Sequence, residues 1–322
     1  MKANLLFSFA LVFALFQFNS CAKDLTFKVA EFSLEKHFEI GVLDGDESYI
    51  FGSINDVEID SYGNIYTLDT KMTQISKFDN QGKFILKFGK KGEGPGEFSF
   101  IESMALDAEN NIYVLDSPKV NVFDERGDFL RLFKHSSIGI DISIDVKGNL
   151  IILGPKGDTI FHKYDKNGDY LYSFGSSFKV PDEFSEFRQA YMFRLPIRVW
   201  TLKEQIYVMN PYKYEIHIYE NNKLIDKLSK PTQNYLKPEF KQHASGGFAG
   251  FVSGNLFHKI DDKLFVFYNG KKANWLDIYE NQKFLKSLEV KGILCAIDDN
   301  SKFYFAEEED YPKLVVYKMK WE

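Results

Sequence analysis

The sequence predicts an all-β protein, a six-bladed β-propeller with four antiparallel strands per blade and a ring closed by the N-terminal strand. A short alternating segment with a penultimate aromatic residue recurs six times, at spacings of 38 to 60 residues. A relative of NIYTLD (64–69) precedes each copy, and turn-forming residues separate these segments in the best copies. Strand units repeated at this period are typical of a propeller, in which one blade cannot bury both of its faces alone. The six aromatic residues are Phe78, Phe123, Tyr164, Tyr219, Tyr279 and Tyr317.

The first copy shows the four strands expected in each blade. In chain order they read DVEID (56–60), NIYTLD (64–69), ISKFD (75–79) and FILKF (84–88). All are short and rich in β-branched and aromatic residues, which is the sequence signature of strands. The chain contains 32 Phe and 18 Tyr, and large flat side chains in that number suit sheets packed face to face.

Glycines mark the expected hairpin turns. Gly63 and Gly148 lie between first and second strands, and Gly82 lies between a third and a fourth strand. Glycine readily adopts the positive φ that a tight turn needs. The tract DKNGD (165–169) also resembles a calcium loop, but it lacks the flanking helices and the downstream Glu of that motif, so we expect a hairpin turn.

The N-terminal strand is expected to complete the last blade. The sixth copy ends at Glu322, directly after its third strand, so a fourth strand is missing there. FEIG (38–41) is followed by a loop into a first strand, as LKFG (86–89) is. Pairing the two chain ends would leave no exposed sheet edge between them. We therefore expect the propeller to occupy residues 32–322, after a short tether at 21–31.

The first 20 residues read as a signal peptide of the lipoprotein type, with lipidation at Cys21. Lys2 precedes an uncharged apolar run from Leu5 to Phe18, which is shorter than the roughly 20 residues of a membrane-spanning helix. FNSC (18–21) resembles a bacterial lipobox; the alternative is an ordinary secretory signal. We expect an exported lipoprotein of the cell envelope, in the outer membrane and facing the periplasm or the surface. Cys295, in the apolar run ILCAI, is expected to be a buried hydrophobe.

The blade pattern resembles the NHL repeat. D-x-x-G-N-I-Y-V-x-D is followed by I-x-x-F-D-x-x-G-x-F and G-x-G-x-G-x-F, with the best copies at 54–100 and 101–133. The chain is similar to the NHL/TolB-like six-bladed propeller lipoproteins of Gram-negative bacteria over residues 32–322. The last three copies lack the Gly turns and the Asp after the second strand. In NHL proteins the Gly-rich segment, here 89–98, is a crossover between blades.

The longest connections are all expected on one face of the propeller, whose central depression we take as the binding surface. Segment 185–200 places arginines among aromatic residues, and such a pair can hold a carboxylate or a sugar hydroxyl. The alternative is that the arginines pair with acidic residues and the aromatics fill the gap between blades. The candidate ligand-binding residues are Arg188, Tyr191, Arg194, Arg198, Tyr212, Tyr214 and Trp275.

The favoured function is an envelope-anchored binding module for a peptide, glycan or envelope protein. The six His residues show no metal-ligand spacing and no nucleophile motif is present, so no catalytic residue, metal or cofactor is expected. The net charge of −6 argues against nucleic acid, and the membrane is expected to be contacted only through the N-terminal lipid. The alternative is a metal-dependent hydrolase or lyase of the lactonase-like propeller type, acting at the central channel.

Overall fold

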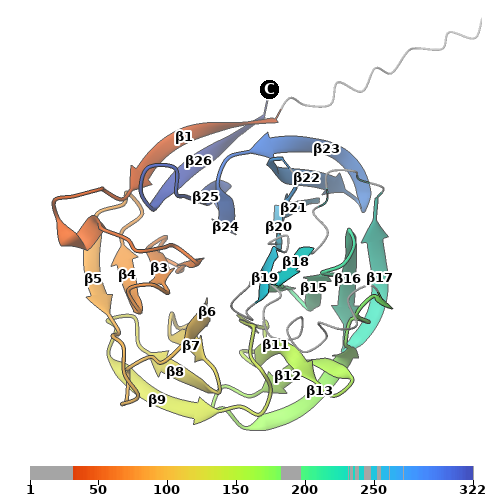
Figure 1. Ribbon diagram of the computed structural model, residues 1–322, viewed down its shortest axis with the longest axis horizontal. Helices are drawn as coiled ribbons and strands as arrows, with labels where there is room; N and C mark the ends of the chain where they lie inside the picture. Colours follow the sequence, from red (N-terminus) through yellow and green to blue (C-terminus); the bar gives the residue numbers. More distant parts are fainter. Residues whose placement is uncertain are drawn as a thin grey trace, which may run out of the picture.

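A computed structural model describes residues 32–182, 197–230, 232, 235, 239–242, 248–251, 255–260, 262–270 and 272–321. Six four-stranded antiparallel sheets stand around a common axis in this part of the chain (Figure 1). The predicted six-bladed propeller is therefore confirmed. Within the described residues, no helix is both long and apolar enough to span a membrane.

Five blades follow one another along the chain, each from its innermost to its outermost strand. The first two blades comprise β2 (Asp56–Ile59), β3 (Ile65–Asp69), β4 (Gln74–Phe78), β5 (Phe84–Phe88), β6 (Ile101–Leu106), β7 (Ile112–Asp116), β8 (Lys119–Phe123) and β9 (Phe129–Lys134). The third and fourth comprise β10 (Asp141–Ile144), β11 (Leu150–Lys156), β12 (Thr159–Tyr164), β13 (Tyr170–Ser176), β14 (Val199–Leu202), β15 (Gln205–Met209), β16 (Glu215–Glu220) and β17 (Lys223–Ser229). The fifth comprises β20 (Asn255–Ile260), β21 (Lys263–Asn269), β22 (Asn274–Glu280) and β23 (Lys283–Val290).

The sixth blade joins the two ends of the propeller. Its inner strands are β24 (Ile293–Ile297), β25 (Lys302–Glu307) and β26 (Lys313–Trp321), and its outermost strand is β1 (Phe32–Ile40). β1 pairs antiparallel with β26 from Phe32↔Trp321 to Ile40↔Leu314. The predicted closure by the N-terminal strand is thus present, and it covers the edge that β26 would otherwise expose.

The hydrophobic core lies between neighbouring blades. Tyr66 and Leu68 of β3 pack against Met104 and Val114 of the next blade, and all four are at most 1% exposed. Ile65 of β3 faces the opposite way and packs against the sixth blade. Both faces of each sheet are therefore buried near the middle strands, which explains why the second strands read as nearly continuous apolar runs. Burying each large side chain contributes about 1.5–3 kcal/mol.

The two faces of the disc differ in their connections. The turn face carries the hairpin turns that follow first and third strands, such as 60–64 and 79–83. Gly63 and Gly82 there have φ of +80° and +86°, as predicted for tight turns. The loop face carries the connections between blades, such as 41–55 and 89–100, the first of which contains the 3-10 turn η1 (Glu47–Tyr49).

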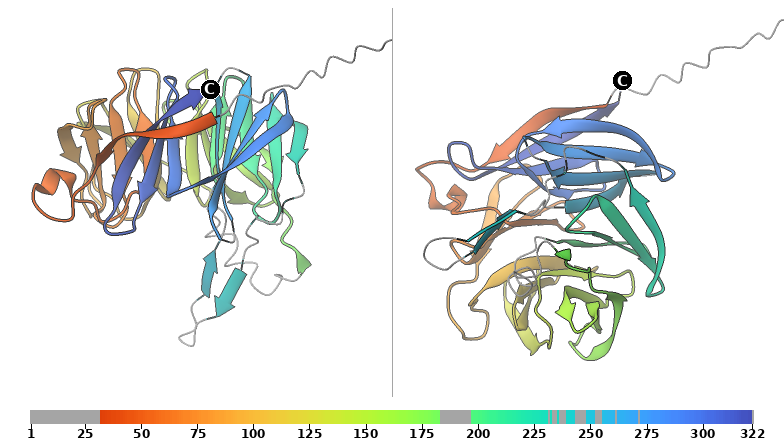
Figure 2. Two further views of the ribbon diagram at one scale, coloured as in Figure 1. Left: turned by 90° about the horizontal axis from the view of Figure 1, so that it is seen from above. Right: turned by 45° about the vertical axis from the view of Figure 1, so that its right-hand side comes forward.

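A hairpin that the sequence did not predict projects from the loop face. It consists of β18 (Glu239–Gln242) and β19 (Phe248–Phe251), which form a separate two-stranded sheet between the fourth and fifth blades in chain order. Figure 2 shows it standing beyond the body of the disc. The binding face expected from loop length is therefore also the face from which this hairpin extends.

Candidate functional site

Arg198 lies near the propeller axis, at the loop-face ends of the innermost strands. Its Nη1 lies 3.0 Å from Oδ2 of Asp56 and 3.2 Å from Oδ1 of Asp141, and its Nη2 donates to the carbonyl oxygen of Asn55 at 2.6 Å. Arg198 directly precedes β14, so one side chain of the fourth blade contacts the innermost strands of the first and third blades. We call Arg198, Asp56, Asp141 and Glu58 the axial cluster.

The carboxylates of this cluster are held by the starts of the innermost strands. Asp56 accepts the backbone N–H of Met104 at 2.9 Å, and Asp141 accepts that of Val199 at 2.7 Å. The hydroxyl of Ser103 donates to Asp141 at 2.5 Å. The side chains of Asp56 and Asp141 are only 8% and 4% exposed, so these charge-assisted bonds compensate much of their desolvation.

Glu58 adds a further carboxyl group, two residues after Asp56 on β2. Burial raises the pKa of Glu58 well above the ordinary value, and the neighbouring carboxylates of Asp56 and Asp141 raise it further. Burial also raises the pKa of Asp141 to about 6, although the Arg198 guanidinium opposes this. The axial cluster therefore concentrates acidic groups around one cation and favours a protonated Glu58.

Cys295 lines the same region from β24. It is 7% exposed, and its burial raises the pKa of the thiol to about 12. Such a thiol stays protonated near neutral pH and is a poor nucleophile. The prediction of a buried, hydrophobe-like cysteine is confirmed.

Two exposed apolar residues stand at the loop-face ends of innermost strands. Phe100 directly precedes β6 and is 73% exposed, whereas Ile293 begins β24 and is 49% exposed. Asp116 fixes the connection that carries Phe100, because its carboxylate accepts the backbone N–H of Phe100 at 2.5 Å and that of Ser99 at 3.0 Å. Phe98, in contrast, is fully buried and packs between blades, as expected for the Gly-rich crossover.

The sequence-predicted residues separate into three groups. Arg188, Tyr191, Arg194 and Cys21 lie outside the described residues. Arg198 lies at the axial opening of the loop face, where the binding surface was expected. The remaining aromatics do not form the exposed rim that we expected around this opening.

Those aromatics belong to the packing between the fourth and fifth blades. Tyr212 and Tyr214 are 9% and 6% exposed, and Trp275 packs against the same cluster. The hydroxyl of Tyr214 donates to Oδ2 of Asp277 at 2.5 Å and is itself contacted by the Tyr279 hydroxyl at 2.9 Å. Tyr212 and Tyr214 lie on the short connection between the second and third strands of the fourth blade, and Trp275 lies near the start of the third strand of the fifth, so these rings pack into the gaps between blades.

Sequence reasoning did not single out Asp56 and Phe100. Asp56 begins the first strand DVEID, and Phe100 ends the Gly-rich crossover, so both stand where a connection reaches an innermost strand. Once the blades are aligned, this position at the start of an innermost strand predicts that a residue lies near the axis. Among the described residues, no group of three or more His, Cys, Asp and Glu side chains is placed to hold a metal ion.

Known proteins share this architecture at low sequence identity. A Bacteroides fragilis protein provisionally named as exported superposes with a TM-score of 0.63 at 16% identity, covering 90% of this chain and 95% of that one. A DUF4221 protein of Bacteroides vulgatus gives 0.56 at 10% identity, covering 91% and 99%. Virginiamycin B lyase of Staphylococcus aureus gives 0.51 at 12% identity, covering 89% and 99%. These similarities show the fold alone.

A curated relative and a family model match the sequence. The Drosophila melanogaster protein named brain tumor is 25% identical over 148 residues, which are 44% of this chain and 14% of that protein. The chain thus spans a small part of that relative's length. The model of the DUF5128 family, described as a 6-bladed beta-propeller, matches residues 24–288. The chain belongs to this DUF5128 family of six-bladed β-propellers.

Proposed function

We propose that this protein is a cell-envelope binding module, anchored by a lipid at Cys21, that binds a peptide segment at the axial opening of its loop face. The observation that carries the proposal is the position of Arg198, whose side chain is 30% exposed between Asp56 and Asp141. Recognition sites commonly combine apolar side chains with a few rigidly held polar or charged groups.

The chemistry of the opening favours a cationic group next to an apolar one. The carboxylates of Asp56 and Asp141 outnumber the single guanidinium of Arg198, and Glu102 of β6 adds an exposed carboxyl group. An ammonium or guanidinium of the ligand would complete this charge distribution. Phe100 offers an exposed ring for an apolar neighbour or for the cation itself.

The anchor would direct the loop face away from the membrane. β1 ends at Ile40, directly before the loop-face connection 41–55, so Phe32 at its other end lies toward the turn face. A tether at 21–31 would then join the turn face, and 11 residues extend at most about 40 Å. The exported Bacteroides fragilis neighbour supports an envelope location. Cys21→Ser is expected to move the protein from the membrane fraction to the soluble fraction.

Peptide binding is tested with the mature protein and an array of peptides that differ in Lys and Arg content. Peptides with a basic residue beside an aromatic or aliphatic one should bind best, and Phe100→Ala and Glu102→Gln should each weaken them several-fold. Leu43→Ala, which removes another exposed side chain of this face, is the matched control (Leu43 is 69% exposed). Binding that ignores peptide charge, or glycan binding that these variants weaken instead, would contradict the peptide assignment.

An enzymatic role is a second candidate, and Glu58 is the observation that favours it. A carboxyl group in a channel with a strongly raised pKa is suited to donate a proton in catalysis. This enzymatic candidate is the metal-dependent hydrolase or lyase of the lactonase-like type. Elemental analysis of the purified protein distinguishes this enzyme from the binding module, because only the metal-dependent enzyme requires a stoichiometric divalent ion. A hydrolytic or lyase activity abolished by Glu58→Gln would then replace the binding module.

A further inference from the structure

A groove crosses the turn face between the third and fourth blades, on the side opposite the axial cluster. Its inner part is a cavity of about 290 Å³ beside the ends of β6, β10 and β14. A narrower part of about 90 Å³ continues outward between the two blades. Both parts share Asp145, Val146, Thr201 and Lys203, so they form one continuous surface.

The groove exists because the fourth blade has shorter turns than the third. The β10–β11 hairpin pairs Ile144 with Leu150 and leaves a five-residue turn, whereas the β14–β15 hairpin pairs Leu202 with Gln205 and leaves only two residues. The third-to-fourth-strand turn of the fourth blade is also short, with Glu220 paired to Lys223. The taller turns of the third blade therefore stand beside lower ones, and the step between them forms one wall.

The groove runs radially, across the strands. Thr201 lies on the innermost strand β14, and Tyr172 lies on the outermost strand β13, so the groove spans about three strand spacings, or ~14 Å. An extended peptide gains affinity chiefly by pairing along a free strand edge. A groove that crosses strands offers no such edge, so this surface does not suit strand addition.

The charges of the lining balance. Three ammonium groups face three carboxylates, and one pair is closed, because Nζ of Lys163 lies 2.6 Å from Oδ2 of Asp145. An ionic ligand would therefore meet groups of both signs. The charged residues are Lys147, Lys163, Lys203, Asp107, Asp145 and Glu204.

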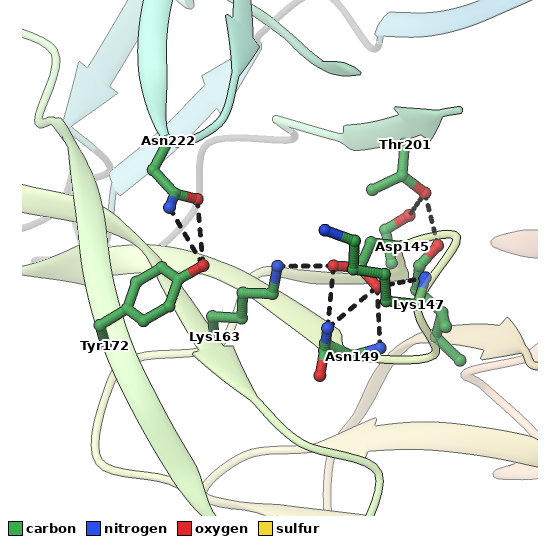
Figure 3. A network of polar contacts seen from close by, with 9 residues as sticks. Asp145, Lys147, Asn149, Lys163, Tyr172, Thr201 and Asn222 are labelled. Carbon is green, nitrogen blue, oxygen red and sulfur yellow. Dashed lines mark hydrogen bonds and ion pairs between the residues drawn. The ribbon is translucent and has the colours of Figure 1, made fainter. Parts of the chain in front are cut away.

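Uncharged hydrogen-bonding groups supply the remaining polar surface. The outer end is bounded by Tyr172, whose hydroxyl accepts from the side-chain amide of Asn222 at 3.0 Å (Figure 3). The Tyr172 ring is 37% exposed, and the inner end adds the hydroxyl of Thr201, which donates to the carbonyl of Ile144 at 2.7 Å. Amides, hydroxyls and an exposed ring along a neutral groove match a chain of hydroxyl groups with apolar C–H faces.

From this arrangement we propose that the groove is a second binding site, which takes a short neutral oligosaccharide. Sugar hydroxyls would form hydrogen bonds with Asn222, Tyr172 and the charged side chains of the lining, which would fix the orientation of the sugar. The inner cavity is near the lower end of the size range of small-ligand pockets, which suits one or two sugar rings, with further rings along the outer part. This site is independent of the peptide site on the loop face.

The test uses the mature protein with three neutral tetrasaccharides: maltotetraose, cellotetraose and chitotetraose. Saturation-transfer NMR detects binding, and calorimetric titration measures its affinity. The variant Asn222→Gly removes the amide while keeping the positive φ of +65° that this turn residue adopts, and Tyr172→Phe removes the hydroxyl. The double variant should bind about tenfold more weakly, as expected for the loss of two hydrogen-bonding groups.

Two controls separate this site from the loop face. Tyr62→Phe changes another exposed tyrosine of the turn face, outside the groove, and should leave affinity unchanged. Phe100→Ala should weaken peptide binding and leave tetrasaccharide binding unchanged. The proposal is overturned if none of the three sugars binds, or if the folded double variant binds as well as the wild type. Sugar binding lost in Phe100→Ala would place it on the loop face, which also overturns the groove assignment.

Discussion

Replacing Arg198 by Met tests whether the axial cluster stabilises the ring. Met keeps the apolar stem and removes the guanidinium, so Asp56 and Asp141 lose their shared cation while the backbone carbonyl of Asn55 loses its donor. Both carboxylates are nearly buried, so leaving them without a cation leaves part of their desolvation cost uncompensated. We expect the variant to fold and to be less stable.

The magnitude follows from burial. Removing one partner of a fully buried ion pair costs about 3–5 kcal/mol. The Arg198 side chain is 30% exposed, so solvent screens part of the interaction, and each carboxylate keeps a backbone N–H donor. We therefore expect a loss of about 2 kcal/mol in the free energy of unfolding at pH 7. Burial raises the pKa of Asp141 to about 6, so its ion pair with Arg198 is lost as the pH falls through that value, and the difference from the wild type should shrink.

Urea unfolding followed by circular dichroism measures this difference. Arg126→Met is the matched control, because Arg126 is 75% exposed and pairs with Asp124 and Asp128 at the surface. Such a pair contributes less than about 1 kcal/mol. If Arg198→Met and Arg126→Met were equally stable, or if the loss grew as the pH fell, the axial ion pairs would not be what links the three blades.

Three further outcomes are expected. Asp116→Ala should cost about 2–3 kcal/mol in urea unfolding and speed amide exchange at Phe100, because a fully buried acceptor of two backbone N–H groups is lost. Burial lowers the pKa of both His135 and His258 to about 4, so the unfolded chain binds more protons than the native one below pH 6.5. Stability should therefore fall from pH 6.5 to about 4, by up to about 3 kcal/mol per histidine, and His258→Gln should flatten the measured profile. Deleting β1 should expose the edge of β26, which size-exclusion chromatography would report as association or aggregation.

Most of the fold could be predicted because its signals are local. The alternation of apolar residues and the turn glycines each identify a strand or turn within four to six residues. Because every blade repeats these signals, a blade with weak signals can be recognised by alignment with the others. The hairpin of β18 and β19 could not be predicted from the repeat, because it occurs only once among the described strands and belongs to no blade. EFKQ and FAGF, its two strands, lack the aromatic repeat that identified the rest.

The site was less predictable because its contacts join distant segments. Arg198 could be placed on the loop face from its position before an innermost strand. Its partners come from the first and third blades, 142 and 57 positions away, and no spacing in the chain marks them. Tyr214 shows the opposite error: an aromatic residue beside a connection was expected to be exposed, but its hydroxyl is bonded to buried Asp277.

The Asp at the end of the second strand explains how the repeat shapes the loop face. Asp69 accepts the backbone N–H of Gly52 at 2.7 Å, and Asp116 does the same for Ser99 and Phe100, so in the first two blades this residue ties the incoming connection to the sheet.

The third blade has Gly154 at the same position. A Cβ there would overlap the carbonyl oxygen of Ile138, so the connection lies directly against the strand. His162 then stabilises that strand end by donating Nε2–H to the Gly154 carbonyl at 2.7 Å. In the first two blades a carboxylate thus bonds to the backbone of the connection, whereas in the third blade the backbone of the connection lies directly against the strand. The same repeat position therefore fixes the incoming connection through a carboxylate in the first two blades and through close backbone packing in the third.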